Sequence, residues 1–130
     1  MSSIFTKIIN GEIPSYKIAE NEYCYAFLDI FPLKKGHTLV IPKLEVDKLF
    51  DLPEEQYNQL MCFTHKIANA IEQSIECKRV GVAVLGLEVP HAHIHLIPID
   101  SEGDLNFKNP KLKFSNQQMQ EIADSIKNKL

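Results

Sequence analysis

Three histidines, His91, His93 and His95, alternate with apolar residues in one short stretch of the chain. Alternate side chains of a β-strand point to opposite faces of a sheet, so this spacing predicts a strand with three imidazoles on one face. Neighbouring imidazoles repel one another when protonated, so at least some of them should be neutral at physiological pH. A neutral imidazole has one donor and one acceptor nitrogen, which suits a nucleophile, a general base or a metal ligand. We therefore expect the chemistry of this chain to lie on that face.

Two kinds of site fit this pattern. A zinc or copper site would use a His-x-His pair with a third ligand, and His37 stands at the start of another predicted strand. A phosphoryl-transfer site would use one imidazole as the nucleophile, because imidazole attacks phosphorus and is then a good leaving group. Its neighbours would donate hydrogen bonds to the phosphate oxygens, where negative charge develops. We favour the phosphoryl-transfer site, with neither a metal ion nor a cofactor.

The periodicity of apolar residues predicts the elements that must hold these histidines. Strands are expected where β-branched and aromatic residues gather, the first two as a hairpin, and residues 79–85 as a central strand because their apolar run is almost continuous. Apolar residues at three- and four-residue steps, behind start signals at Asp51-x-x-Glu54 and Ser115-x-x-Gln118, predict two amphipathic helices. The predicted strands span residues 16–20, 22–30, 37–41, 79–85 and 92–97, the last ending at Pro98, and the helices span 4–9, about 51–76 and 115–130. This order of elements is typical of an α+β domain with a mostly antiparallel sheet.

Length, charge and cysteine content exclude several classes of protein. The 130 residues fit one domain, residues 1–130, and a formal net charge of −3 gives no basic surface for nucleic acid. No apolar run approaches the ~20 residues that a transmembrane helix needs. The three cysteines are far apart and form no Cys-x-x-Cys pair, as is usual in a reducing compartment. We therefore expect a cytoplasmic protein that binds neither nucleic acid nor membrane.

Several segments of the chain match one known family. Residues 91–97 follow the histidine triad motif, His-φ-His-φ-His-φ-φ, where φ is apolar, and residues 4–14, 26–30 and 36–42 resemble the opening segment and two central blocks of the same family. The chain resembles the histidine triad (HIT) nucleotide-binding proteins over residues 4–98. The resemblance implies a HIT-like fold: an antiparallel sheet of about five strands, one long helix, a short N-terminal helix and a C-terminal helix. It also implies a homodimer in which two protomers form one continuous sheet.

The resemblance also implies a role for each polar candidate. His93 would be the nucleophile that forms a nucleotidyl-histidine intermediate on the α-phosphate, and His95 would bond a phosphate oxygen. His91 would orient and polarise the nucleophile through its backbone or its ring, and His37 would join the same hydrogen-bonded cluster. Asp29 would accept the ribose hydroxyls, for which a carboxylate is suitable. The base pocket would be walled by apolar residues for which ordinary core packing is an equally good explanation: Ile4, Phe5, Ile8, Phe27, Leu28 and Ile30.

The chain departs from the family pattern in places that affect the substrate. Many relatives carry Gly-Gln-Ser or Gly-Gln-Thr shortly before the triad, next to the phosphate, whereas this chain has Gly86-Leu87-Glu88. A carboxylate at Glu88 would repel an anionic polyphosphate but not a cationic amine. Ser3 and Thr6 stand where some bacterial relatives have a Cys-x-x-Cys that binds structural zinc, so we expect no zinc there.

Taken together, these features predict a hydrolase of purine nucleotide conjugates. The expected substrate is a nucleoside 5′-phosphoramidate, with adenosine as the favoured base, cleaved through a covalent nucleotidyl-histidine intermediate. A dinucleoside polyphosphate hydrolase or a nucleotidyl transferase would use the same residues with another leaving group. A module that binds a nucleotide without turning it over is the third possibility.

Overall fold

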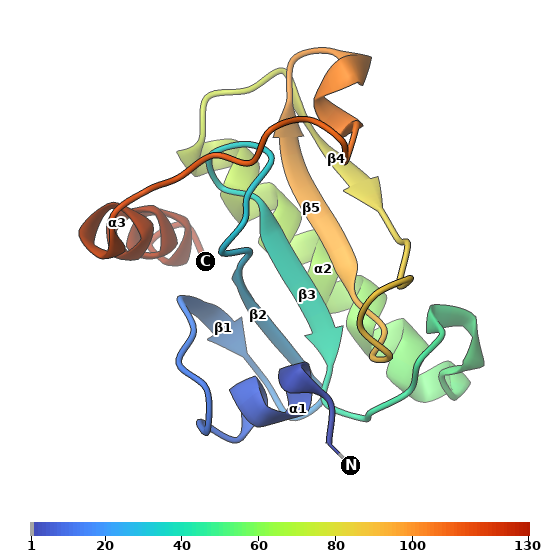
Figure 1. Ribbon diagram of the computed structural model, residues 1–130. Coiled ribbons are helices and arrows are strands. Elements are labelled where there is room, and N and C mark those ends of the chain that lie inside the picture. The colour runs from blue at the N-terminus through green and yellow to red at the C-terminus, as the bar shows by residue number, and fades with distance from the viewer. Residues whose placement is uncertain (1) are drawn as a thin grey trace.

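The computed structural model describes residues 2–130, which fold into one five-stranded sheet and three α-helices (Figure 1). This α+β arrangement confirms the predicted fold class. None of these helices combines the length and the apolar character that crossing a membrane requires. The strands are β1 (Lys17–Glu20), β2 (Cys24–Leu28), β3 (Thr38–Pro42), β4 (Arg79–Ala83) and β5 (Ile94–Ile99), and the helices are α1 (Ile4–Ile9), α2 (Glu54–Ser74) and α3 (Asn116–Lys127), with 3-10 turns η1 (Leu49–Asp51) and η2 (Glu102–Leu105).

The sheet is antiparallel throughout, in the order β1-β2-β3-β5-β4. The prediction of a central strand at residues 79–85 was therefore wrong, because β4 lies at the edge and pairs with β5 alone. A continuous apolar run is typical of a strand buried on both faces, but no residue of β4 is fully buried in the described chain. The side chain of Val82, in the middle of β4, is 56% exposed.

The two faces of the sheet pack against different helices, and all five residues of β2 are buried. Cys24, Ala26 and Leu28 belong to the core shared with α2, which lies behind the sheet in Figure 1. Tyr25 and Phe27 point to the other face and pack with the buried side chains of α1. The period-two alternation of side chains along β2 thus separates a large core from a smaller one on the side of α1.

The two long helices have the apolar periodicity and the start signals that their sequences predicted, with one difference at the start of α2. The residues of α2 that face the core recur at three- and four-residue steps, and helix α2 begins at Glu54, directly after Pro53. Asp51, expected to start this helix, instead ends η1. Helix α3 has the predicted capping box, in which Ser115 Oγ accepts from the Gln118 amide at 3.1 Å and the Gln118 side chain accepts from the Ser115 amide at 2.8 Å.

The histidine stretch enters the sheet later than its pattern predicted. Strand β5 begins at Ile94, so His91 and His93 lie in the bend before it, and it continues through Pro98, which lies opposite Val80. The predicted alternation itself is present, because the apolar partners of the histidines belong to the α2 core. Those partners are Ala92, Ile94 and Leu96.

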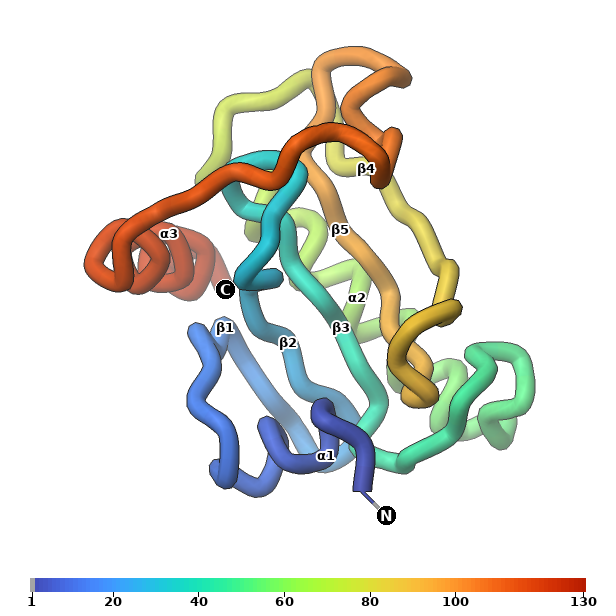
Figure 2. Tube along the Cα trace, viewed as in Figure 1, coloured from blue at the N-terminus to red at the C-terminus, as the bar shows by residue number. Residues whose placement is uncertain are grey.

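A segment after η2, residues 106–113, crosses one end of the sheet on its way to α3, and we call it the strap (Figures 1 and 2). It is fastened where the Leu112 amide donates to the Pro32 carbonyl at 2.8 Å. The strap therefore lies beside the loop that leads to His37.

Candidate active site

A cavity of about 700 Å³ opens on the face of the sheet that carries α1. This volume is ordinary for a small-molecule site. Every candidate residue named from the sequence lines the cavity except His91, which is fully buried beside it. Those lining residues are His37, His93, His95, Asp29, Glu88, Ile4, Phe5, Ile8, Phe27, Leu28 and Ile30.

The hydrogen bonds of His93 determine which of its nitrogens holds a proton. Nδ1 lies 2.7 Å from the carbonyl oxygen of His91. A carbonyl can only accept, so Nδ1 must carry the proton of the neutral ring, and Nε2 keeps a lone pair. The ring is 7% exposed and meets the edge of Phe5, with centroids 5.1 Å apart. A nitrogen with a free lone pair at a cavity wall can attack an electrophile.

The ring of His91 is held at both nitrogens. Its Nε2 lies 2.8 Å from the Pro42 carbonyl and therefore donates, while its Nδ1 lies 2.7 Å from Ser3 Oγ and therefore accepts the hydroxyl proton. Burial lowers the pKa of this imidazole below its usual value. The ring also packs against Phe5, with centroids 5.7 Å apart. His91 is therefore held inside the protein by hydrogen bonds and packing instead of lining the cavity. The alternating pattern alone did not distinguish it from the other two histidines.

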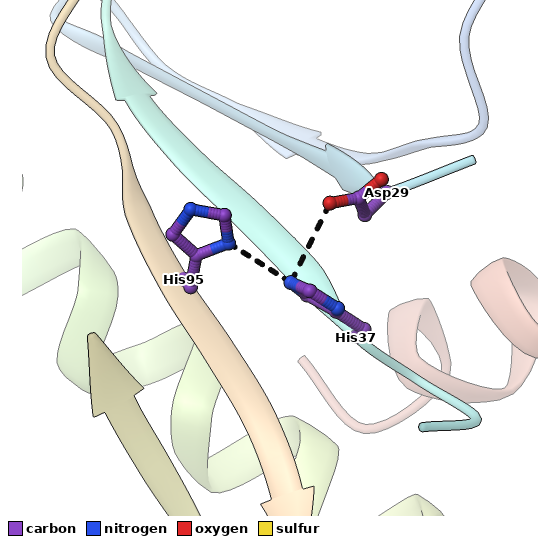
Figure 3. A group of neighbouring side chains, drawn as sticks. All are labelled: Asp29, His37 and His95. Atoms are coloured by element: carbon purple, nitrogen blue, oxygen red, sulfur yellow. Dashed lines mark hydrogen bonds and ion pairs between the residues drawn. The ribbon is translucent and has the colours of Figure 1, made fainter. Parts of the chain in front are cut away.

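A second chain of hydrogen bonds joins His37, directly before β3, to His95 in the neighbouring strand β5 (Figure 3). The Leu33 amide donates to His37 Nδ1 at 3.0 Å, so the proton of the His37 ring is on Nε2. That nitrogen lies 2.9 Å from His95 Nδ1 and donates to it. His95 consequently carries its own proton on Nε2, as a donor available to a ligand.

Two features hold the backbone around His37 in place. Gly36, just before His37, has φ +90°, a conformation that favours glycine, and an added Cβ would lie 2.9 Å from a side-chain carbon of Ile75. The Asp29 amide donates to the His37 carbonyl at 3.0 Å. The start of β3 and the end of β2 are therefore fixed together.

Burial determines the charge state of this cluster. It lowers the pKa of His37 to about 3 and that of His95 to about 4, with the positive charge of neighbouring groups adding to the effect. Both rings are therefore neutral at physiological pH. Burial also raises the pKa of Asp29, against the opposing effect of the Phe31 amide, which donates to its carboxylate at 2.9 Å.

Asp29, His37 and His95 are close enough together to be considered as metal ligands, with donor atoms within 4.8 Å of one another. Their hydrogen bonds argue against that use. A ligating nitrogen must offer a lone pair, but His37 Nε2 carries a proton because Leu33 donates to the other nitrogen. Asp29 Oδ2 lies 3.5 Å from that same nitrogen, whose proton is already donated to His95 (Figure 3).

The apolar end of the cavity lies between α1 and β2. Phe5, Ile8, Phe27 and Leu28 are buried, so they serve the core as well as the cavity wall. Two further candidates for this wall are exposed, Ile4 at 48% and Ile30 at 61%. Glu88 is also exposed, on the loop between β4 and the triad.

The sequence did not point to two residues of the strap that complete the cavity. The ring of Phe107 meets His95 edge-on, with centroids 4.9 Å apart, and His37 at 6.3 Å. Lys111 also lines the cavity, and its ammonium donates to the carbonyls of Phe107 and Asn109. No motif marks this segment, and only the contacts of the folded chain bring it to the histidines.

Comparison with known proteins identifies the family to which the chain is similar. The HIT domain family matches residues 10–102. The chain is 37% identical over 137 residues to Protein hit of Bacillus subtilis, covering 98% of this chain and 93% of that protein. It is 33% identical over 132 residues to the adenosine 5′-monophosphoramidase of Schizosaccharomyces pombe, covering 100% of this chain and 99% of that one.

The fold is also that of solved relatives. The crystal structure of a Hit-like protein from Bartonella henselae superposes with a TM-score of 0.86 at 30% identity, covering 99% of this chain and 96% of that one. The family match includes β5 and the histidines before it, among them His93 and His95, which line the cavity. With sequence, fold and histidine cluster in agreement, the chain belongs to the HIT domain family of nucleotide-binding hydrolases.

Proposed function

We propose that this protein hydrolyses the phosphorus–nitrogen bond of purine nucleoside 5′-phosphoramidates through a covalent intermediate on His93. One observation carries the proposal: the His91 carbonyl accepts a hydrogen bond from Nδ1–H of His93, which leaves the Nε2 lone pair for the cavity. A relative similar over the whole chain is named an adenosine 5′-monophosphoramidase, which supports the same reaction.

In the first step, the His93 Nε2 lone pair forms a bond to the α-phosphorus, and the bond from phosphorus to the amine breaks. The amine leaves with its electron pair and takes a proton from solvent. His93 keeps its Nδ1 proton, so the nucleotidylated ring is a cation beside the His91 carbonyl, which favours it electrostatically.

In the second step, water attacks the same phosphorus, and the bond to His93 Nε2 breaks. The water releases one of its protons to solvent, the ring recovers the electron pair of the broken bond on Nε2 and becomes neutral, and the nucleoside 5′-monophosphate is released. His95 Nε2–H would donate to a phosphate oxygen in both steps, because His37 occupies its Nδ1.

The remaining candidates would bind the nucleoside and select the leaving group. Asp29 lies at the end of β2 on the cavity, where its carboxylate would accept the ribose hydroxyls. The buried aromatic and aliphatic wall beside it would hold the base. Glu88 adds a negative charge to the rim, which favours a cationic amine over an anionic polyphosphate as leaving group.

The test is release of AMP from adenosine 5′-phosphoramidate by the wild-type protein and two variants. His93→Ala should lose turnover by about a thousandfold or more, because no other group replaces the nucleophile. His65→Ala should retain it, because His65 is an exposed residue of α2. Equal turnover by wild type and His93→Ala, or none by either, would contradict the proposal.

Competition on one preparation distinguishes the other leaving groups. With a diadenosine polyphosphate present in the same reaction, the ratio of kcat/KM values identifies the preferred substrate. A clear preference for the polyphosphate would assign the protein to dinucleoside polyphosphate hydrolysis or nucleotidyl transfer. Tight AMP binding without turnover of either compound would assign it to the non-catalytic binding modules.

A homodimer and a cytoplasmic location are part of the same proposal. The outer edge of β4 pairs with no strand among residues 2–130, and Val82, Val84 and Leu85 on and after it are 45–56% exposed. An unpaired apolar edge favours pairing with a second copy of the strand. The cysteines are all free thiols, as expected in a reducing compartment.

A further inference from the structure

Ser3 links the first helix to the histidine triad, and the proposed reaction does not assign it a role. It precedes α1 and is 7% exposed. Its hydroxyl oxygen accepts from the Thr6 amide at 3.0 Å, which caps the helix, and lies 2.7 Å from His91 Nδ1. One buried hydroxyl therefore contacts both α1 and the ring of His91, although 88 residues separate Ser3 and His91 in the sequence.

The direction of this hydrogen bond follows from its neighbours. His91 Nε2 must donate to the Pro42 carbonyl, so Nδ1 of the neutral ring is an acceptor and Ser3 supplies the proton. The single hydroxyl proton of Ser3 is thereby committed to His91. The nearby Thr6 hydroxyl donates elsewhere, to Glu45 at 2.6 Å.

Glu45 fixes Ser3 from the other side. Its carboxylate oxygen accepts from the Ser3 amide at 2.7 Å as well as from Thr6. These hydrogen bonds lower the pKa of Glu45, so the carboxylate stays charged. Thr6 and Glu45 thus hold the Ser3 hydroxyl where it meets the His91 ring.

We propose that Ser3 is a positioning residue for the nucleophile: its hydroxyl keeps His91 in the orientation and tautomer that aim the His91 carbonyl at Nδ1 of His93. This proposal rests on the proposed function of His93, but not on the identity of the leaving group. The effect passes from Ser3 to the ring of His91, from that ring to its own backbone, and from the backbone carbonyl to His93 at 2.7 Å.

The physical reason is the cost of an unpaired buried acceptor. Without the hydroxyl, His91 Nδ1 would have no partner, and moving the proton to Nδ1 would set the Nε2 lone pair against the Pro42 carbonyl. Either outcome favours a shift of residue 91. Its carbonyl would then make a weaker hydrogen bond to Nδ1–H of His93. The tautomer of His93 that has its lone pair on Nε2 would be less populated.

The experiment compares Ser3→Ala with a control that loses the same kind of helix cap. Ser115 caps α3 as Ser3 caps α1, with amide-to-hydroxyl distances of 3.1 and 3.0 Å, but Ser115 has no histidine contact among its hydrogen bonds. Ser3→Ala should lower kcat by about tenfold with KM within about twofold, and Ser115→Ala should leave both unchanged. Ser3→Thr, which keeps the hydroxyl, should restore kcat to within about threefold of wild type.

A readout that needs no substrate tests the same idea. Ring ¹⁵N shifts from NMR report directly which nitrogen of His91 and of His93 carries the proton. In wild type and Ser115→Ala, His93 should be protonated on Nδ1 and His91 on Nε2, and Ser3→Ala should show mixed tautomers at both. If Ser3→Ala does not fold, Ser3→Gly removes the hydroxyl with only a small loss of capping.

The outcomes separate this proposal from the proposed function. Unchanged kcat and unchanged ring shifts in Ser3→Ala or Ser3→Gly would overturn the role of Ser3 while leaving His93 as nucleophile. Absence of turnover by the wild type would overturn the proposed function, and the ring shifts would still decide whether Ser3 sets the tautomers.

Discussion

Nδ1 of His93 and the carbonyl oxygen of His91 lie 2.7 Å apart, in a hydrogen bond whose direction allows only one neutral tautomer of His93. Two histidines of the triad thus act on each other through a backbone group rather than through their rings. The third, His95, has the opposite arrangement, because its Nδ1 accepts from His37 and its Nε2 carries the proton. The motif therefore contains one nitrogen suited to attack and another suited to hydrogen-bond the charge that attack creates.

Asp29→Asn should weaken nucleoside binding without slowing the chemical step. An amide offers one acceptor oxygen where the carboxylate offers two, so KM should rise about tenfold with kcat within about threefold. Calorimetry with AMP and 2′,3′-dideoxy-AMP checks the cause. The wild type should prefer AMP and the variant should not, whereas an unchanged preference would remove Asp29 from the ribose site.

The free energy of unfolding should decrease on acidification because buried histidines resist protonation. In the folded chain the pKa of His37 is about 3, below its usual value of 6.5, so the unfolded chain binds the proton first and stability is lost progressively as the pH falls through that interval. Between about pH 7 and about pH 5 the loss should be about 2 kcal/mol for this group, measured by urea unfolding.

The variant that checks this assignment is His37→Asn, whose stability should depend less on pH over the same range. His65→Gln, at an exposed position of α2, should keep the wild-type dependence. Parallel pH curves for wild type and His37→Asn would show that His37 does not contribute to the acid sensitivity.

Phe107→Ala should expose the His37–His95 pair to water. The Phe107 ring lies 4.9 Å from that of His95, and burial is the main cause of the low pKa of His95, about 4. Removing the ring should raise this pKa toward 6.5, as followed by NMR titration of the imidazole. Phe50→Ala, at an 83% exposed aromatic outside the cavity lining, is the matched control. A titration curve identical to that of the control would show that the strap does not shield His95.

Val82→Asp should convert the proposed dimer to a monomer. Val82 is 56% exposed on the edge strand β4, where a carboxylate would oppose its copy across a symmetric interface. Sedimentation velocity should report twice the monomer mass for wild type and for Phe50→Asp, and the monomer mass for Val82→Asp. A monomer mass for the wild-type protein would contradict the proposed dimer.

Most of the fold could be predicted because its signals are local. The capping box at Ser115 and the alternation of Ala92, Ile94 and Leu96 each involve a few neighbouring residues, and both are present in the structure. The order of strands is not a local property. Residues 79–85 were predicted to form a central strand because their apolar composition is typical of one. In the folded chain β4 pairs with β5 and with no other strand of the described sheet, so it lies at the edge.

The histidines that line the cavity could be named from the sequence, but the positions of the protons on their side chains could not. The triad spacing identifies imidazoles that can do chemistry, but it does not say that Leu33 donates to His37 or that Ser3 donates to His91. Those bonds depend on where one amide and one hydroxyl lie after folding. The contact between Phe107 and His95 was not predicted either, because no residue near Phe107 in the sequence indicates it.

The strap has a consequence for how one chemistry can serve different substrates. The HIT domain match ends at residue 102, yet Phe107 and Lys111 beyond it form part of the cavity wall. The histidines and the strap are thus joined by contact but belong to separate stretches of sequence. Changes at strap residues other than Phe107, such as Lys111, can therefore reshape the cavity wall while the triad and its hydrogen bonds stay as they are. We expect substrate preference to vary among relatives through this segment without any change in the catalytic residues.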